Sequence, residues 1–227
     1  MTARFPNVEG MDALKRFAKD IWIANGPVVR FLGISFPTRM IVVRLGDGSL
    51  WVNSPVAATR DQAAQLEDIG PVAHLVSPTP LHDWRLEQWA SFFPRAQVWK
   101  ACALDDATPA AWKADIDQPR FRGSIVLSET EFFHKPSRTL IMGDFIQNYA
   151  SERGRPLVNA LKRLGGVLGG GSPRDLRFSF VGRRRRRLGE ESLRKILWWD
   201  FDKIIIAHGD LTVNNARALV ERAFGWL

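Results

Sequence analysis

The sequence predicts an α/β fold of the α+β kind, in which two β-rich halves are each closed by helices. Strands dominate the beginning of the chain, and strands and helices alternate after Thr59. In the second half, two mostly apolar runs, Thr139–Met142 and Ile204–Ile206, are typical of strands buried on both faces. Polar residues follow each run closely, so we expect the chemistry of the protein at the carboxyl ends of these strands.

Local patterns place the elements of the first half. The turn Gly46–Gly48 has the composition of a tight hairpin, and Thr59 with Gln62 three residues later forms a capping box that opens a helix ending near Asp68. The Trp-rich segment His82–Phe92 predicts a second helix. Strands are predicted at Gly26–Ser35, Met40–Leu45, Ser49–Asn53, Val72–Val76 and Gln97–Lys100.

The second half repeats this plan around a basic insert at about residues 150–190. No linker or internal repeat divides the chain, so one domain over residues 1–227 is predicted. Helices are predicted at Pro109–Lys113, Gly189–Trp199 and Val213–Phe224. Strands are predicted at Ser124–Leu127, Glu131–His134, Thr139–Met142 and Ile204–Ile206.

Composition predicts a protein with a large core. Hydrophobic residues make up 45% of the 227 residues, including nine Trp and fourteen Phe. No apolar stretch approaches the roughly twenty residues of a membrane span, and Met1–Pro6 lacks the apolar core of a signal peptide, so we expect a cytoplasmic protein. The single Cys102 excludes an internal disulfide and a cysteine-cluster zinc site, and a buried position is predicted for it.

Positive charge is concentrated in the insert. Residues 151–195 hold thirteen Lys or Arg against four Asp or Glu, a net charge of +9, whereas the rest of the chain carries −1. The run Arg183, Arg184, Arg185, Arg186 and Arg187 follows a glycine-rich stretch, and arginine forks suit phosphates, acidic lipid or anionic metabolites. The alternative is a solvated, partly mobile segment. No interleaved aromatic motif accompanies the run, which disfavours nucleic acid as the partner.

Three segments together resemble a known family. They are Leu140–Phe145, a strand ending in Gly-Asp, Ile206–Asp210, a strand ending in Ala-His-Gly-Asp, and the hairpin Met40–Pro55. The combination resembles the αββα sandwich of the metallo-β-lactamase superfamily, which includes hydroxyacylglutathione hydrolases and ribonuclease Z. The resemblance implies that Asp144 takes the place of an aspartate that bridges two metals, and His208 that of the terminal histidine ligand.

The same resemblance implies a reduced metal site. Where the family has His-x-His-x-Asp-His, this chain has Pro78-Thr79-Pro80-Leu81-His82-Asp83, and a further family histidine corresponds to Phe121. The first metal site thus lacks its three imidazoles. His82, Asp83, Asp144 and His208 supply the ligand types of the second site, with the first two in swapped order, and such a set suits one zinc, iron or manganese ion.

Each of these residues also has a structural alternative. His82 and Asp83 suit the first turn of a helix, and Asp144 and His208 can hydrogen-bond each other without any metal. The chain further resembles a bacterial subfamily of the same fold, a domain of unknown function with degraded metal motifs, in Arg39–Leu45 and Trp199–Asp202.

Two functions therefore stay open. The first is a protein without two-metal hydrolase activity that binds an anionic ligand or partner, with no metal or one. The second is a divergent single-metal hydrolase acting on an ester, thioester or phosphodiester. The sequence alone does not decide between an enzyme and a binding protein.

Overall fold

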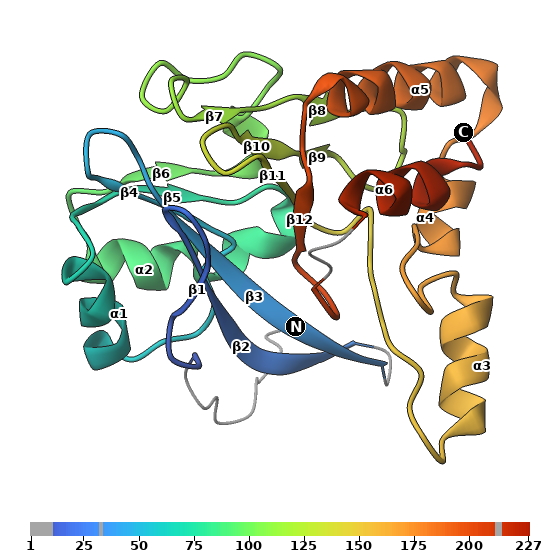
Figure 1. Ribbon diagram of the computed structural model, residues 1–227, viewed down its shortest axis with the longest axis horizontal. Coiled ribbons are helices and arrows are strands. Elements are labelled where there is room, and N and C mark those ends of the chain that lie inside the picture. The colour runs from blue at the N-terminus through green and yellow to red at the C-terminus, as the bar shows by residue number, and fades with distance from the viewer. Residues whose placement is uncertain (1–10, 32–33, 212–214) are drawn as a thin grey trace. The chain divides into compact units, whose positions relative to one another are not determined.

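The computed structural model describes residues 11–31, 34–211 and 215–227 (Figure 1). The chain is an α/β protein with two mixed sheets and helices. It divides into two compact units: unit 1 comprises Met1–Ser77 and Leu81–Trp99, and unit 2 comprises Pro78–Pro80 and Lys100–Leu227. The single domain over residues 1–227 stays a prediction.

Unit 1 is built around a six-stranded sheet in the order β1-β2-β3-β4-β5-β6. Its first four strands pair antiparallel, and β4, β5 and β6 pair parallel. An apolar cluster that includes Val42, Val52, Leu66 and Trp89 forms its core. The elements are β1 Lys15–Ala18, β2 Ile21–Phe31, β3 Ile34–Arg44, β4 Leu50–Asn53, α1 Arg60–Glu67, β5 Val72–Val76, the 3-10 helix η1 Pro80–Arg85, α2 Leu86–Phe92 and β6 Gln97–Trp99.

In unit 1 the predicted hairpin and capping box are confirmed, whereas the bounds of one strand and one helix are not. The Gly46–Gly48 hairpin and the capping box of Thr59 and Gln62 are both present. The predicted strand Gly26–Ser35 is wrong, because it runs from β2 into β3, and its residues 32–33 lie outside the described residues. A register shift after Gly26 lets β2 continue through Gly26 and Pro27. The predicted helix His82–Phe92 begins as η1 and becomes α-helical only at Leu86.

Unit 2 contains a four-stranded sheet in the order β12-β11-β10-β7 and the two-stranded sheet β8-β9. In the larger sheet β11 and β12 are parallel, whereas β10 pairs antiparallel with β11 and β7. The elements are η2 Ala101–Ala103, β7 Ile116–Asp117, β8 Arg120–Phe121, β9 Glu129–Thr130, β10 Phe132–His134, β11 Thr139–Met142, α3 Pro156–Leu164, α4 Arg174–Phe178, α5 Gly182–Trp198, β12 Lys203–Ile206 and α6 Ala216–Phe224.

Three sequence-based expectations are wrong in unit 2. Pro109–Lys113 forms hydrogen-bonded turns rather than a helix. Ser124–Leu127 is not a strand, because the Ser124 hydroxyl accepts the backbone N–H groups of Val126 and Leu127 at 3.1 and 3.0 Å, which bends the chain. Cys102 is exposed rather than buried. The strands β10, β11 and β12 were predicted correctly.

The arginine run belongs to helix α5. The helix begins at Gly182, whereas the sequence predicted a start at Gly189. Arginine is a good helix former, so the run supports the extra turns. Gly189 lies inside the helix at a point of close packing, where a Cβ atom would lie 2.8 Å from the Phe180 ring.

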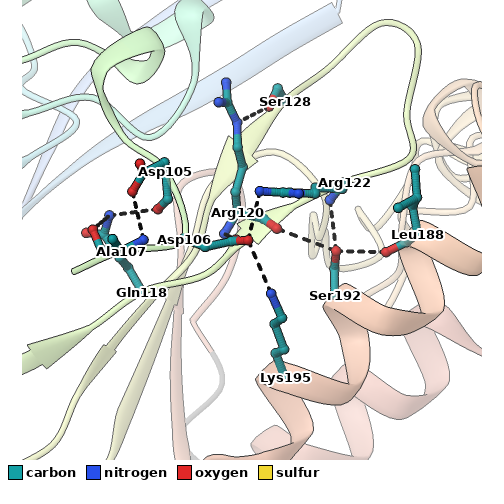
Figure 2. Close-up of polar contacts among 10 residues, drawn as sticks. All are labelled: Asp105, Asp106, Ala107, Gln118, Arg120, Arg122, Ser128, Leu188, Ser192 and Lys195. Carbon is teal, nitrogen blue, oxygen red and sulfur yellow. Dashed lines mark hydrogen bonds and ion pairs between the residues drawn. The ribbon is translucent and has the colours of Figure 1, made fainter.

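Polar contacts fix α5 to the strand β8 within unit 2 (Figure 2). Ser192 Oγ accepts the backbone N–H of Arg122 at 3.0 Å and donates to the carbonyl of Leu188 at 2.9 Å. Asp106 forms ion pairs with Arg122 at 2.8 Å and with Lys195 at 3.2 Å (Figure 2). These contacts attach the second half of α5 to the rest of unit 2. The first turns of the same helix carry the five arginines.

None of the helices formed by residues 11–31, 34–211 and 215–227 combines the length and the apolar character that spanning a bilayer requires.

Candidate functional site

Asp144 and His208 lie against each other at one edge of the sheet of unit 2. They follow β11 and β12, which are parallel neighbours in register over their whole lengths. Because parallel strands end at the same edge of a sheet, the residues after them are brought together. His208 Nε2 lies 3.0 Å from Asp144 Oδ1, and both side chains are buried. The structure thus unites two of the predicted site residues.

The loop after His208 is held by close backbone contacts. Gly209 has a φ of 94°, and a Cβ atom there would lie 1.8 Å from the carbonyl oxygen of Asn148. Only glycine permits this approach. Asp210 N–H donates to that same carbonyl at 2.6 Å, and Asp210 Oδ2 accepts the N–H of Ala150 at 2.9 Å. The backbone is therefore fixed directly after His208.

Glu129 fixes the backbone on the Asp144 side. Its carboxylate accepts the N–H groups of Gly143, of Asp144 at 2.8 Å and of Phe145 at 3.3 Å. Three successive backbone N–H groups of a buried loop thus donate to one carboxylate. These N–H groups lie outside the strands and helices, so Glu129 supplies the acceptor that regular secondary structure does not. Thr79 Oγ1 in turn donates to Asp144 Oδ2 at 3.2 Å. The Asp144 carboxylate is oriented by Thr79 and His208, and its backbone by Glu129.

Glu129 and Glu131 form a pair of fully buried carboxyl groups. Burial, reinforced by the negative charge of Asp144, raises the pKa of Glu129 to about 8. Burial, reinforced by the charge of Glu129, raises the pKa of Glu131 well above its usual value. Like charges in a dry environment cannot both ionise at neutral pH, so the folded protein keeps at least one proton on the pair.

This pair makes a prediction for the pH dependence of stability. Because the folded-state pKa values lie above the unfolded ones, the folded chain binds more protons, and the free energy of unfolding falls by about 1.4 kcal/mol per pH unit for each such proton. The contribution of Glu129 is full below the unfolded value of 4.5 and is lost as the pH rises through about 8. We expect Glu131→Gln, which mimics the protonated acid, to make this fall shallower.

Urea unfolding between mildly acidic and mildly alkaline pH measures the effect. At the alkaline end, Glu131→Gln should be more stable than the unaltered protein. Glu67 is an exposed glutamate on α1, and Glu67→Gln is the matched control, for which we expect the unaltered slope. Identical slopes for Glu131→Gln and the unaltered protein would show that the buried pair does not hold the extra proton.

In unit 1, His82 lies in η1 and its Nδ1 is 2.7 Å from the hydroxyl of Ser54. Ser54 follows β4, within the segment Met40–Pro55, and has a φ of 52°. If Nδ1 carries the proton and donates to Ser54, Nε2 is left as a metal ligand, as in metal sites where a second hydrogen bond fixes the tautomer. Asp83 also lies in η1, and its Oδ1 is buried without a hydrogen-bond partner among the described residues.

Within unit 2, Asp144 and His208 offer one carboxylate and one imidazole, ligand types that suit zinc, iron or manganese. His82 in unit 1 stays a predicted ligand of the same ion. The assignment of Asp83 as a further ligand stays a prediction. Because metal ligands must be deprotonated, binding of a metal by Asp144 and His208 would weaken at low pH.

The positions that resemble the family's first metal site are occupied differently. Phe121 is fully buried in unit 2 and packs against other aromatic rings, at 4.6 Å from Phe145 and 4.9 Å from Phe224 between ring centroids. Pro78 and Pro80 offer no donor atom, and Thr79 between them binds Asp144. Phe121 thus contributes core packing in unit 2, and Thr79 orients the Asp144 carboxylate.

Arg183–Arg187 are all exposed in the first turns of α5. Arg187 pairs with Glu191 one turn later at 3.0 Å, an exposed ion pair of small energetic weight. The segment is helical rather than a mobile excursion. Clustered cations at a helix amino terminus repel one another and oppose the helix dipole, so an anion bound there would relieve both effects.

Comparison with solved structures shows that the chain has the metallo-β-lactamase fold. The DIM-1 metallo-β-lactamase has a TM-score of 0.59 at 14% identity, with 97% of this chain and 98% of that chain covered. A mono-zinc NDM_FIM-1 like metallo-β-lactamase from Erythrobacter litoralis has a TM-score of 0.56 at 14% identity, with 99% and 98% covered. The metal-soaked Flv1 flavodiiron core from Synechocystis sp. PCC6803 has a TM-score of 0.63 at 10% identity, with 96% of this chain covered; this chain spans 61% of that core.

At the level of sequence, residues 19–103 match the family model described as "Domain of unknown function (DUF4336)". No curated protein sequence matches this chain. The identities to the solved structures are so low that they establish the fold alone.

Proposed function

We propose that this chain binds an anionic ligand or partner through Arg183–Arg187 and lacks two-metal hydrolase activity. The observation that carries this proposal is the exposure of all five arginines in one helix that polar contacts anchor. Guanidinium groups offer paired N–H donors that match phosphate and carboxylate oxygens. The replacement of three expected imidazoles by Pro78, Pro80 and Phe121 supports the second part, because two metals are needed to clamp both reacting oxygens.

Retention on heparin tests the anion binding. We expect a variant with all five arginines changed to glutamine to elute at clearly lower salt than the unaltered protein, because the retention depends on surface charge that salt screens. A variant with five lysines at the same positions is the matched control and should keep most of the retention, since it keeps the charge. If the glutamine variant elutes with the unaltered protein, the arginine run is not the anion-binding segment.

A second candidate function is a single-metal hydrolase, and the approach of His208 Nε2 to Asp144 Oδ1 within unit 2 favours it. One bound metal would supply an activated water at neutral pH. The chain's own residues would orient that centre, with Thr79 and Glu129 fixing Asp144. Arginines of α5 would then hold an anionic substrate.

For this candidate we expect weak or absent turnover of β-lactam, thioester and phosphodiester substrates, even with zinc, iron or manganese added. The expectation follows from the lack of a second metal. Initial rates for the unaltered protein, Asp144→Asn and His208→Ala provide the measurement. Robust metal-dependent turnover that both changes abolish would favour the hydrolase over the binding protein.

A further inference from the structure

Helix α3 in unit 2 exposes its apolar side chains. Leu157, Leu161 and Leu164 have exposed fractions of 80%, 67% and 61%, and no residue of the helix is buried. Their spacing of four and three residues places them on one face of the helix. In Figure 1, α3 lies away from the β10-β11-β12 sheet of unit 2, so this face does not pack on that sheet. A soluble helix usually buries such a stripe.

The side of α3 that does contact the rest of unit 2 is polar. Lys162 Nζ lies 2.7 Å from Glu152 Oε1 and donates to the carbonyl of Ala150 at 3.0 Å. Asn159 Nδ2 donates to the carbonyl of Glu152 at 2.8 Å. Lys162 and Asn159 are three residues apart, on the side of the helix opposite to the leucines. The helix is thus attached through its polar face and presents its leucines outward, an arrangement that suits an apolar partner.

The surroundings of α3 along the chain are basic and carry more exposed apolar groups. Phe178 at the end of α4 is 78% exposed, and Val181 just before α5 is 61% exposed. Arg155 and Arg163 are exposed on or next to α3, and Arg183–Arg187 follow on α5. The net charge of +9 over residues 151–195 belongs to this same segment.

We propose that α3 and the arginines of α5 bind the surface of a bilayer that contains anionic phospholipid. The leucines would enter the boundary between headgroups and acyl chains, and the arginines would contact lipid phosphates, as basic amphipathic helices do at membrane surfaces. This inference rests on the anion binding proposed above and names its partner.

A lipid surface fits both features of the segment, and other occupants fit only one. Nucleic acid or a soluble anion matches the arginines and leaves the leucines exposed to water. A second copy of the chain would cover the leucines but would bring two segments of net charge +9 together, which charge repulsion opposes. An anionic bilayer matches the charge and the apolar stripe together.

Co-sedimentation with vesicles of phosphatidylcholine, with and without phosphatidylglycerol, tests the proposal. We expect binding to the anionic vesicles and little to the neutral ones. A variant with Leu157→Gln, Leu161→Gln and Leu164→Gln should bind anionic vesicles at least about tenfold more weakly, because it loses the apolar contribution, and should keep its elution from heparin. Trp198→Gln removes another exposed apolar side chain, 89% exposed at the far end of α5, and should bind as the unaltered protein does.

The outcomes separate this inference from the proposed function. Suppose that the leucine variant keeps full vesicle binding while the five-glutamine variant loses both vesicle and heparin binding. The arginines then bind anions, but α3 does not contact the membrane. If the leucines instead hold a dimer, light scattering during gel filtration will show a mass that halves in the leucine variant, and the proposal is wrong. If the five-glutamine variant keeps its heparin elution, the proposed anion binding itself fails.

Discussion

The His208→Ala variant is expected to lose more than about a hundredfold in affinity for a divalent metal, because the change removes a ligand outright. The reason lies in unit 2, where His208 Nε2 and Asp144 Oδ1 lie 3.0 Å apart and both side chains are buried. Titration of zinc in competition with a chromophoric chelator measures the affinity, and elemental analysis after dialysis measures the stoichiometry. All variants should carry Cys102→Ser, because this exposed thiol could bind zinc on its own.

Four further variants test which of the other candidate residues contribute to the metal affinity. Asp144→Asn and His82→Ala should weaken binding to a similar extent, whereas Ser54→Ala should weaken it about tenfold through loss of the hydrogen bond that orients His82. Asp83→Asn decides between three and four protein ligands. If His82→Ala leaves the affinity unchanged, the metal belongs to Asp144 and His208 in unit 2. Unchanged affinity in His208→Ala would place the metal elsewhere.

Glu129→Ala is expected to lower the free energy of unfolding by about 3–5 kcal/mol, since it leaves buried N–H groups without an acceptor. The groups are those of Gly143, Asp144 and Phe145, all of which donate to the Glu129 carboxylate. Glu129→Gln is the matched variant: it retains one acceptor oxygen and the shape of the side chain, so we expect it to cost less. Urea unfolding of the three proteins at one pH gives the comparison.

A small difference between Glu129→Ala and the unaltered protein would contradict this account. It would mean that water or a rearranged loop satisfies the three N–H groups as well as the carboxylate does. Because Asp144 follows the same loop, the metal titration of Glu129→Gln also shows whether the Glu129 contact positions the carboxylate.

Local sequence signals predicted much of the fold, and the errors have both local and tertiary causes. The capping box at Thr59 and the Gly46–Gly48 hairpin involve neighbours in the chain, and both were predicted correctly. The segment after Ser124 has strand-like composition, but its hydroxyl bends the backbone. The start of α5 was misplaced because Gly189 was interpreted as a helix boundary, whereas its packing against Phe180 explains it.

The sequence predicted those residues of the candidate site that follow buried strands. Asp144 and His208 follow apolar runs, and the pairing of β11 with β12 brings them together. Thr79 and Glu129 were missed, since their roles depend on tertiary contacts with Asp144, which is 65 residues from Thr79 and 15 from Glu129. The only sequence signal for Glu129 is its spacing from Glu131. Residues two positions apart in an extended segment point to the same side, and this segment leads into a buried strand.

The packing of Phe121 limits which residues position 121 can accept. Its ring is in contact range of Phe145, Phe180 and Phe224, so the place of one expected imidazole is now part of an aromatic core. A histidine at position 121 would set a polar ring among apolar neighbours and leave a void, at a cost of several kcal/mol on the scale of core substitutions. The aromatic core of unit 2 therefore makes a metal ligand at this position costly for the stability of the fold.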